Sequence, residues 1–108
     1  MRGQTVSEQL RLAGVVRITT LQARSGQAAE LMDAVRRNAR EARAASGCLS
    51  AEACVDPRER DTVLVISRWE SEVAVRAFLD WHERSARGVL SPYAVSAPRS
   101  VHYPVPVP

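Results

Sequence analysis

Lysine is absent from this 108-residue sequence, in which all fifteen basic residues are arginine. Without a lysine amine, the chain can form neither a Schiff base with a carbonyl substrate nor a Walker A phosphate-binding loop. Aromatic residues are also few, at 5% of the chain, and acidic residues are interleaved with the arginines, so the net charge of +3 is spread along the sequence. Nucleic-acid binding is not expected, because it uses a basic surface with stacking aromatic side chains.

Long apolar runs are missing as well. No stretch of about 18 apolar residues is present, and residues 1–21 lack a continuous apolar segment, so neither a membrane span nor a secretory signal is predicted. We therefore expect a cytoplasmic protein with no membrane partner. Cys48 and Cys54 would lie about 20 Å apart in one extended strand, beyond the limit of about 7 Å for a disulfide. They have no His or Cys neighbours at ligand spacing, so we predict neither a metal site nor a cofactor.

The residues that are present predict strands and helices in alternation. Residues 14–23 are rich in β-branched side chains and form the first predicted strand. A helix follows from Ser25 and Gly26, because apolar residues then recur at helical spacing, and Gly47 is expected to end it as a left-handed cap. The arginines of this helix lie off its apolar stripe and predict a solvent-exposed face.

A hairpin is predicted next. Residues 48–55 alternate between the two faces of a strand, residues 56–61 form a polar turn around Pro57, and residues 62–69 form a second strand. This second strand is apolar almost without interruption. Such a run indicates a sheet that is covered on both faces.

A second helix and a last strand complete the predicted elements. Ser71 is expected to cap a helix whose inward face includes Phe78 and Trp81, with Gly88 at its end. Residues 99–105 form the last strand. Its alternating prolines are expected to keep the chain beyond Val105 out of the sheet.

The order β-α-β-β-α-β predicts an α+β protein with a ferredoxin-like split βαβ fold, in which a four-stranded antiparallel sheet carries two helices on one face. We place this domain at residues 13–105, between a flexible tail at 1–12 and a proline-rich end at 106–108. The helices cover only one face of the sheet. A second sheet from an identical subunit would cover the other, which predicts a homodimer in the form of a dimeric α/β barrel.

Two short motifs carry a family resemblance. Gly47-Cys48-Leu49-Ser50 precedes the hairpin, and Trp69-Glu70-Ser71-Glu72 opens a helix rich in Ala and Phe. With the turn around Asp56 and the strand at 63–68, they resemble the antibiotic biosynthesis monooxygenase (ABM) family of small dimeric α/β-barrel proteins, over residues 14–103. The resemblance implies a cofactor-independent monooxygenase acting on a small aromatic or polyketide-type compound in secondary metabolism. Two alternatives stay open, a polyketide cyclase using the same pocket and a non-catalytic ligand-binding or accessory dimer.

The resemblance does not extend to the haem-degrading branch of this superfamily. Those enzymes use an Asn on the first strand, a second Trp downstream of the Trp that opens the second helix, and a His further along that helix. Here the first strand has no Asn, the ninth residue after Trp69 is Phe78, and the position of the His falls near Gly88. Haem degradation is therefore not expected.

Four residues are candidates for catalysis. Trp69 lies at the strand-to-helix junction, where it either donates its indole N–H to a substrate oxygen or packs over the end of the core. His82, on the second helix, is either a pocket base, since histidine titrates near neutral pH, or a surface residue. Tyr93 is a possible lid hydroxyl. His102 is the fourth, and it points to the opposite face of the last strand from Tyr103.

Five further residues are candidates for substrate binding. Charged side chains occur on strands that we expect to be covered on both faces, at Arg17, Glu52 and Arg68, and a buried charge must be paired. They form either a salt-bridge cluster inside the barrel or contacts to a substrate oxyanion. Phe78 and Trp81 are the other two candidates, on the inward face of the second helix.

Overall fold

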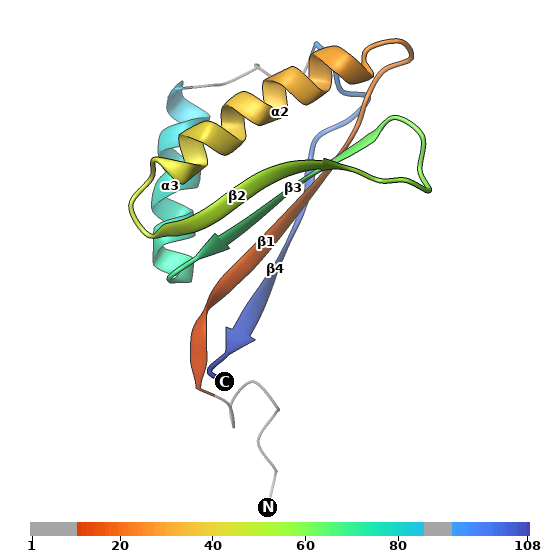
Figure 1. The fold of residues 1–108 in the computed structure, drawn as a ribbon. Helices are drawn as coiled ribbons and strands as arrows, with labels where there is room; N and C mark the ends of the chain where they lie inside the picture. Colours follow the sequence, from red (N-terminus) through yellow and green to blue (C-terminus); the bar gives the residue numbers. More distant parts are fainter. Residues whose placement is uncertain (1–10, 86–91) are drawn as a thin grey trace, which may run out of the picture.

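The computed structural model of the protein describes residues 11–85 and 92–108, which form a four-stranded sheet and two helices (Figure 1). The elements are β1 (Leu12–Gln22), α2 (Ala28–Arg43), β2 (Cys48–Val55), β3 (Thr62–Trp69), α3 (Glu72–Ser85) and β4 (Arg99–Pro106). The sheet is antiparallel with the strand order β2-β3-β1-β4, and both helices lie on one face. This arrangement confirms the predicted ferredoxin-like fold. The predicted helix end at Gly88 and residues 1–10 of the predicted tail lie outside the described residues.

Side chains of each strand alternate between the two faces of the sheet. In β1, Val15 and Leu21 face the helices and are buried. The strand register pairs Arg17 with Ser67 of β3 and with His102 of β4, so these three side chains lie on the same helix-covered face. Ser67 is buried there, whereas Arg17 and His102 are partly buried.

The hydrophobic core fills the space between the sheet and the helices. It consists of two clusters, one of Val15, Ala39, Ala42, Ala51, Trp69 and Val75, the other of Leu21, Ala23, Leu31, Val35, Val63 and Ala94. The small alanines of α2 let this helix lie close to the strands. Trp69, the largest fully buried side chain, anchors the first cluster at the junction of β3 and α3.

The predicted cap at the start of α3 is confirmed, whereas the predicted cap at the end of α2 is not. At the start of α3, the Oγ of Ser71 accepts a hydrogen bond of 3.1 Å from the backbone N–H of Ala74, as its predicted capping role requires. The prediction for Gly47 is wrong, because α2 is capped by Ala44 in a right-handed conformation. Gly47 has φ +83° in the turn before β2, where an added Cβ would lie 2.6 Å from the Cβ of Ala74. Its role is close packing against α3.

The edge pair of strands is longer than predicted. β1 begins at Leu12, inside the predicted tail, and Leu12 pairs with Pro106 of β4. The expectation that the prolines keep the chain beyond Val105 out of the sheet is thus wrong. β4 is an edge strand, and proline is tolerated there because its missing N–H can face away from the neighbouring strand.

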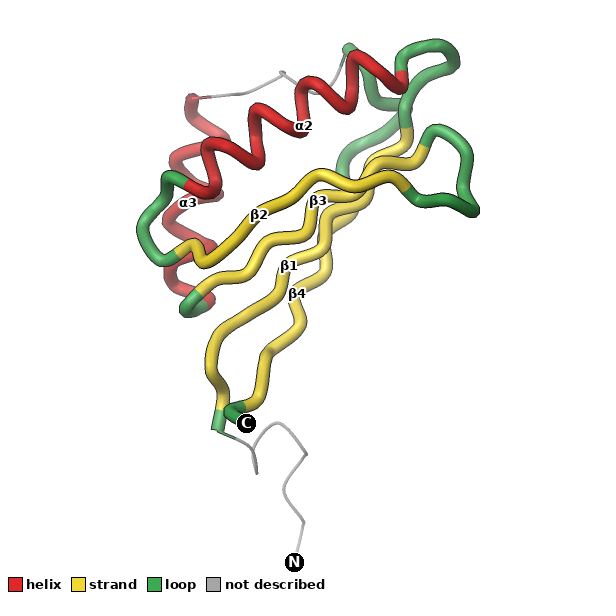
Figure 2. The backbone as a smooth tube through the Cα atoms, in the orientation of Figure 1, coloured by secondary structure: helices red, strands yellow, loops and turns green. Residues whose placement is uncertain are grey.

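The second face of the sheet carries no helix in the described part of the chain (Figure 2). Its centre is a row of three apolar side chains, since Ile18 pairs with Ile66 on one side and with Val101 on the other. Ile66 is 37% exposed and Val101 is 49% exposed. A continuous apolar surface across three strands is typical of an interaction face.

Candidate functional site

A cavity of about 140 Å³ lies between the sheet and the two helices. Most of its wall is apolar, and includes the side chains of Val35, Ala42 and Leu79. The polar side chains that line it come from four elements, and are Arg17, Thr19, Asn38, Ser67 and His82. Apolar walls with a few convergent polar groups are typical of small-molecule sites.

Trp69 closes one side of the cavity. Its indole Nε1–H donates a hydrogen bond of 2.8 Å to the Oγ of Ser67, and the side chain is 1% exposed. Its ring centroid lies 5.3 Å from that of Phe78, which also lines the cavity. Indole has a single donor, and Ser67 already accepts it. Trp69 therefore forms a wall of the cavity in this structure, and its single donor is bonded to Ser67.

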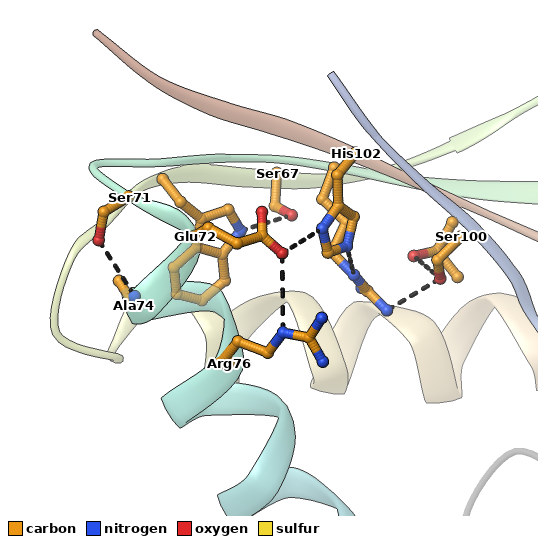
Figure 3. A network of polar contacts seen from close by, with 10 residues as sticks. Ser67, Ser71, Glu72, Ala74, Arg76, Ser100 and His102 are labelled. Carbon is orange, nitrogen blue, oxygen red and sulfur yellow. Dashed lines mark hydrogen bonds and ion pairs between the residues drawn. The ribbon is translucent and has the colours of Figure 1, made fainter. Parts of the chain in front are cut away.

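Arg17 is held in place by β4. Its Nε–H donates to Nε2 of His102 over 3.1 Å, and its Nη2 donates to the Oγ of Ser100 over 2.9 Å. The Oγ of Ser100 is in turn 2.9 Å from the Oγ1 of Thr19. The network is shown in Figure 3, where Ser100 and His102 project from the same strand. These contacts fix the plane of the guanidinium.

The far side of His102 is bonded to α3. Its Nδ1 lies 2.8 Å from Oε1 of Glu72, in the first turn of that helix (Figure 3). Because Arg17 can only donate, Nε2 of His102 must accept, and the proton of the neutral ring lies on Nδ1, which donates to Glu72. Glu72 also lies 3.9 Å from the Nε of Arg76. The imidazole thus links the carboxylate of Glu72 to Arg17.

Burial lowers the pKa of Arg17 from its ordinary value, and the negative charge of Glu72 partly counteracts this shift. No ion pair within 4.0 Å involves Arg17 among residues 11–85 and 92–108. The side chain remains a cation, because arginine is not deprotonated in proteins near neutral pH. The cavity therefore contains a positive charge without a direct counter-ion from the described residues.

His82 provides a second polar group on the helical side of the cavity. Its Nε2 lies 3.1 Å from Oδ1 of Asn38 and 3.8 Å from Oε2 of Glu41. An amide oxygen accepts, so Nε2 carries the proton and Nδ1 of the neutral ring is left as an acceptor. The centroid of the His82 ring lies 5.5 Å from that of the Phe78 ring. This Glu41 oxygen is buried and has no hydrogen-bond partner among the described residues.

The remaining candidates lie elsewhere. Glu52 and Arg68 project from the sheet face away from the helices, so the predicted cluster with Arg17 does not form. Trp81 is 47% exposed in a surface groove between α2 and α3. Tyr93 packs against the Leu21 cluster and does not line the cavity. His102 reaches the cavity only through Arg17, and it lies on the opposite face of β4 from Tyr103, which matches the predicted alternation.

Five polar residues of the site were not among the sequence candidates, namely Thr19, Asn38, Ser67, Glu72 and Ser100, although the sequence contains a signal for Ser67 and Asn38. Ser67 lies in phase with Val65 and Trp69, so it is a hydroxyl on the buried side of an apolar strand. Asn38 lies seven residues after Leu31 and four before Ala42, on the apolar stripe of α2. Glu72 gives no such signal, because its partner His102 is thirty residues away.

The model of the family described as antibiotic biosynthesis monooxygenase matches residues 14–86. The chain belongs to this family. No functionally curated protein matches the sequence.

Solved structures show the same fold as this ABM protein. A proposed antibiotic biosynthesis monooxygenase from Nitrosomonas europaea has a TM-score of 0.77 at 12% identity, over 87% of this chain and 91% of that chain. A Pseudomonas aeruginosa protein has a TM-score of 0.72 at 20% identity, over 85% of this chain and 93% of that chain. At such identities the similarity shows the fold alone.

None of the helices within 11–85 and 92–108 is long and apolar enough to cross a membrane. The same residues contain no group of three His, Cys, Asp or Glu side chains that could hold a metal ion.

Proposed function

We propose that this ABM protein is a cofactor-independent monooxygenase that acts on a small single-ring phenol or enol, bound in the cavity between the sheet and the helices. The observation that carries the proposal is the cavity itself, with apolar walls for a ring and polar side chains from β1, β3, α2 and α3 directed at the same space. The family supports the reaction class.

The cavity volume supports a single ring. Engineered apolar cavities of about 150 Å³ bind benzene, whereas most ligand pockets exceed about 300 Å³. The cavity here is about 140 Å³. A bicyclic phenol, or a poly-β-ketone long enough to cyclise, needs more space. Among the expected substrates we therefore favour a small aromatic compound over a polyketide, and monooxygenation over polyketide cyclisation.

The proposed reaction needs no external reductant. A phenol loses its proton, the resulting anion passes an electron to O₂, and the two radicals combine at a ring carbon. One oxygen atom of O₂ becomes the new carbonyl of a quinone, and the other leaves as water with the two substrate hydrogens. The substrate supplies all four electrons that O₂ requires. The protein needs only to position the ring and move the proton.

His82 is our candidate for the proton acceptor. Its Nε2–H is held by Asn38, which leaves Nδ1 as the basic atom. The carboxylate of Glu41, 3.8 Å from Nε2, would stabilise the imidazolium that forms. Phe78 and Trp69 would hold the ring from the side of the first core cluster.

The test measures O₂ uptake and product formation with a panel of monocyclic phenols under ¹⁸O₂. We expect one labelled oxygen in the quinone, and a decrease in kcat of about 10²- to 10⁴-fold for His82→Gln. Glu83→Gln, at the exposed neighbouring position, is the control and should retain activity. Ring binding without O₂ uptake would favour the non-catalytic alternative, and a quinone without label would exclude monooxygenation.

We also propose a homodimer in which the uncovered faces of two sheets pack together. Support comes from the apolar row formed by Ile18, Ile66 and Val101, and from the family, whose members are typically dimers. Ile66→Asp should convert the dimer to a monomer of 11.9 kDa in sedimentation experiments. Val73→Asp is the matched control, because Val73 is 78% exposed on α3. A monomeric wild-type protein at micromolar concentration would contradict the proposal.

The cytoplasm is the proposed location. Cys48 and Cys54 are both free thiols. Free thiols are typical of proteins in reducing compartments.

A further inference from the structure

We propose that the ligand of this cavity binds as an anion, with its oxyanion held by Arg17, and that His102 and Ser100 position the guanidinium for this contact. The inference rests on the proposed function, because it assumes that a single ring occupies the cavity. It adds the chemical class of the ligand, a ring that carries a carboxylate, phenolate or enolate oxygen.

The positive charge of Arg17 favours an anionic ligand. Arg17 projects into the space between the sheet and the helices, and no carboxylate of the described residues lies within 4.0 Å of it. Arg17 is partly buried, and a charge that has lost part of its hydration is stabilised by an opposite charge nearby. The carboxylate of Glu72 is connected to Arg17 only through the imidazole of His102. An anionic ligand would supply the missing counter-ion.

The unused hydrogen-bond donors of Arg17 also favour an anionic ligand. A guanidinium has five N–H donors in a planar fork. Nε–H is donated to His102 and one Nη2–H to Ser100. Three N–H groups therefore have no acceptor in the described part of the chain. The fork matches the two oxygens of a carboxylate, or a single charged oxygen between two donors.

The side chain of Arg17 is preorganised for such a contact. Arginine loses much rotamer freedom when it is fixed in one orientation. Here the chain Glu72–His102–Arg17 and the contact to Ser100, whose Oγ is itself bonded to Thr19, fix it before any ligand arrives. A charge-assisted contact to the ligand then requires no further ordering of the side chain. Burial lowers the pKa of Arg17, because the site removes part of the hydration that stabilises the charged guanidinium.

The test compares benzoate with benzamide, which have the same ring and nearly the same shape but differ in charge. Calorimetry at neutral pH should show benzoate binding at least about 10-fold more tightly than benzamide to the wild-type protein. In Arg17→Met the ratio should fall to about one, while benzamide binding persists. Arg17→Lys keeps the charge without the fork and should give an intermediate ratio.

His102 is tested as a positioning residue by two variants. His102→Gln retains an acceptor near Nε2 and should preserve the preference for benzoate. His102→Leu removes that acceptor and should lower the preference, with benzamide binding unchanged. A merely structural role would affect both probes equally.

The outcomes separate this inference from the proposed function. If benzamide binds and Arg17→Met leaves the benzoate preference unchanged, the anion site is refuted while the ring site stands. If neither probe binds the wild-type protein, a single-ring site in this cavity is refuted, and the anion site with it. Circular dichroism of each variant checks that it is folded.

Discussion

Filling the cavity from α2 should stabilise the protein and at the same time abolish ligand binding. Ala42 lines the cavity and is 4% exposed. Ala42→Leu adds three carbon atoms, which at about 0.8 kcal/mol for each buried methylene contribute about 2.4 kcal/mol. Fixing the leucine rotamer costs about 0.5 to 1 kcal/mol. We therefore expect the free energy of unfolding to rise by about 1.5 kcal/mol.

The matched control is the same substitution at Ala34. This residue lies on the same helix and is 0% exposed, but it does not line the cavity. Three extra carbon atoms would there enter close-packed surroundings, and such overpacking typically costs about 1 to 3 kcal/mol. The two Ala→Leu variants should thus differ in the sign of their effect on stability, although their chemistry is the same.

Urea denaturation followed by tryptophan fluorescence measures both variants, since Trp69 is buried in the native state. All samples need the same protein concentration, because dimerisation would contribute to apparent stability. Benzamide binding by calorimetry gives the second readout. If Ala42→Leu destabilises the protein as much as Ala34→Leu, the cavity is not free space. If it binds benzamide like the wild type, the ligand binds elsewhere.

Three smaller perturbations test other parts of the fold. Gly14→Ala should lower the free energy of unfolding by at least about 3 kcal/mol, because Gly14 has φ +130° and its new Cβ would overlap a backbone oxygen of Trp69. Gly26→Ala is the control. Gly26 has φ +76° and open space around it, so this variant should lose only about 1 kcal/mol of stability. Burial raises the pKa of Cys48, so the stabilising contribution of its thiol is complete below the thiol pKa of the unfolded chain and is lost as pH rises. In urea titrations, the wild type should therefore lose stability above about pH 8.5 relative to Cys48→Ala. Ser71→Ala should lower the melting temperature through a loss of about 1 kcal/mol, and an unchanged value would show that the cap is not formed.

The bounds of both hairpin strands could be predicted from the sequence, because they are marked by residues next to them in the chain. The alternation in Cys48–Val55 and the apolar run in Thr62–Trp69 are separated by a turn containing Pro57, so both strand ends are marked by neighbouring residues. Gly47 and Pro106 depart from prediction because their positions depend on distant contacts. Gly47 packs against α3, and Pro106 is tolerated because β4 lies at the sheet edge.

The location of Arg17 could not be derived from the sequence because both faces of β1 are apolar. Register is specified by the hydrophobic pattern only where the two faces of a strand differ, and a shift of one residue exchanges them. The register pairs Arg17 with Ser67 and places Arg68 opposite Val16, so the two arginines project to opposite faces of the sheet. The register thus rules out the predicted single cluster of charged strand residues. Once the register is known, the same alternation brings His102 beside Arg17 and leaves Arg68 exposed on the uncovered face.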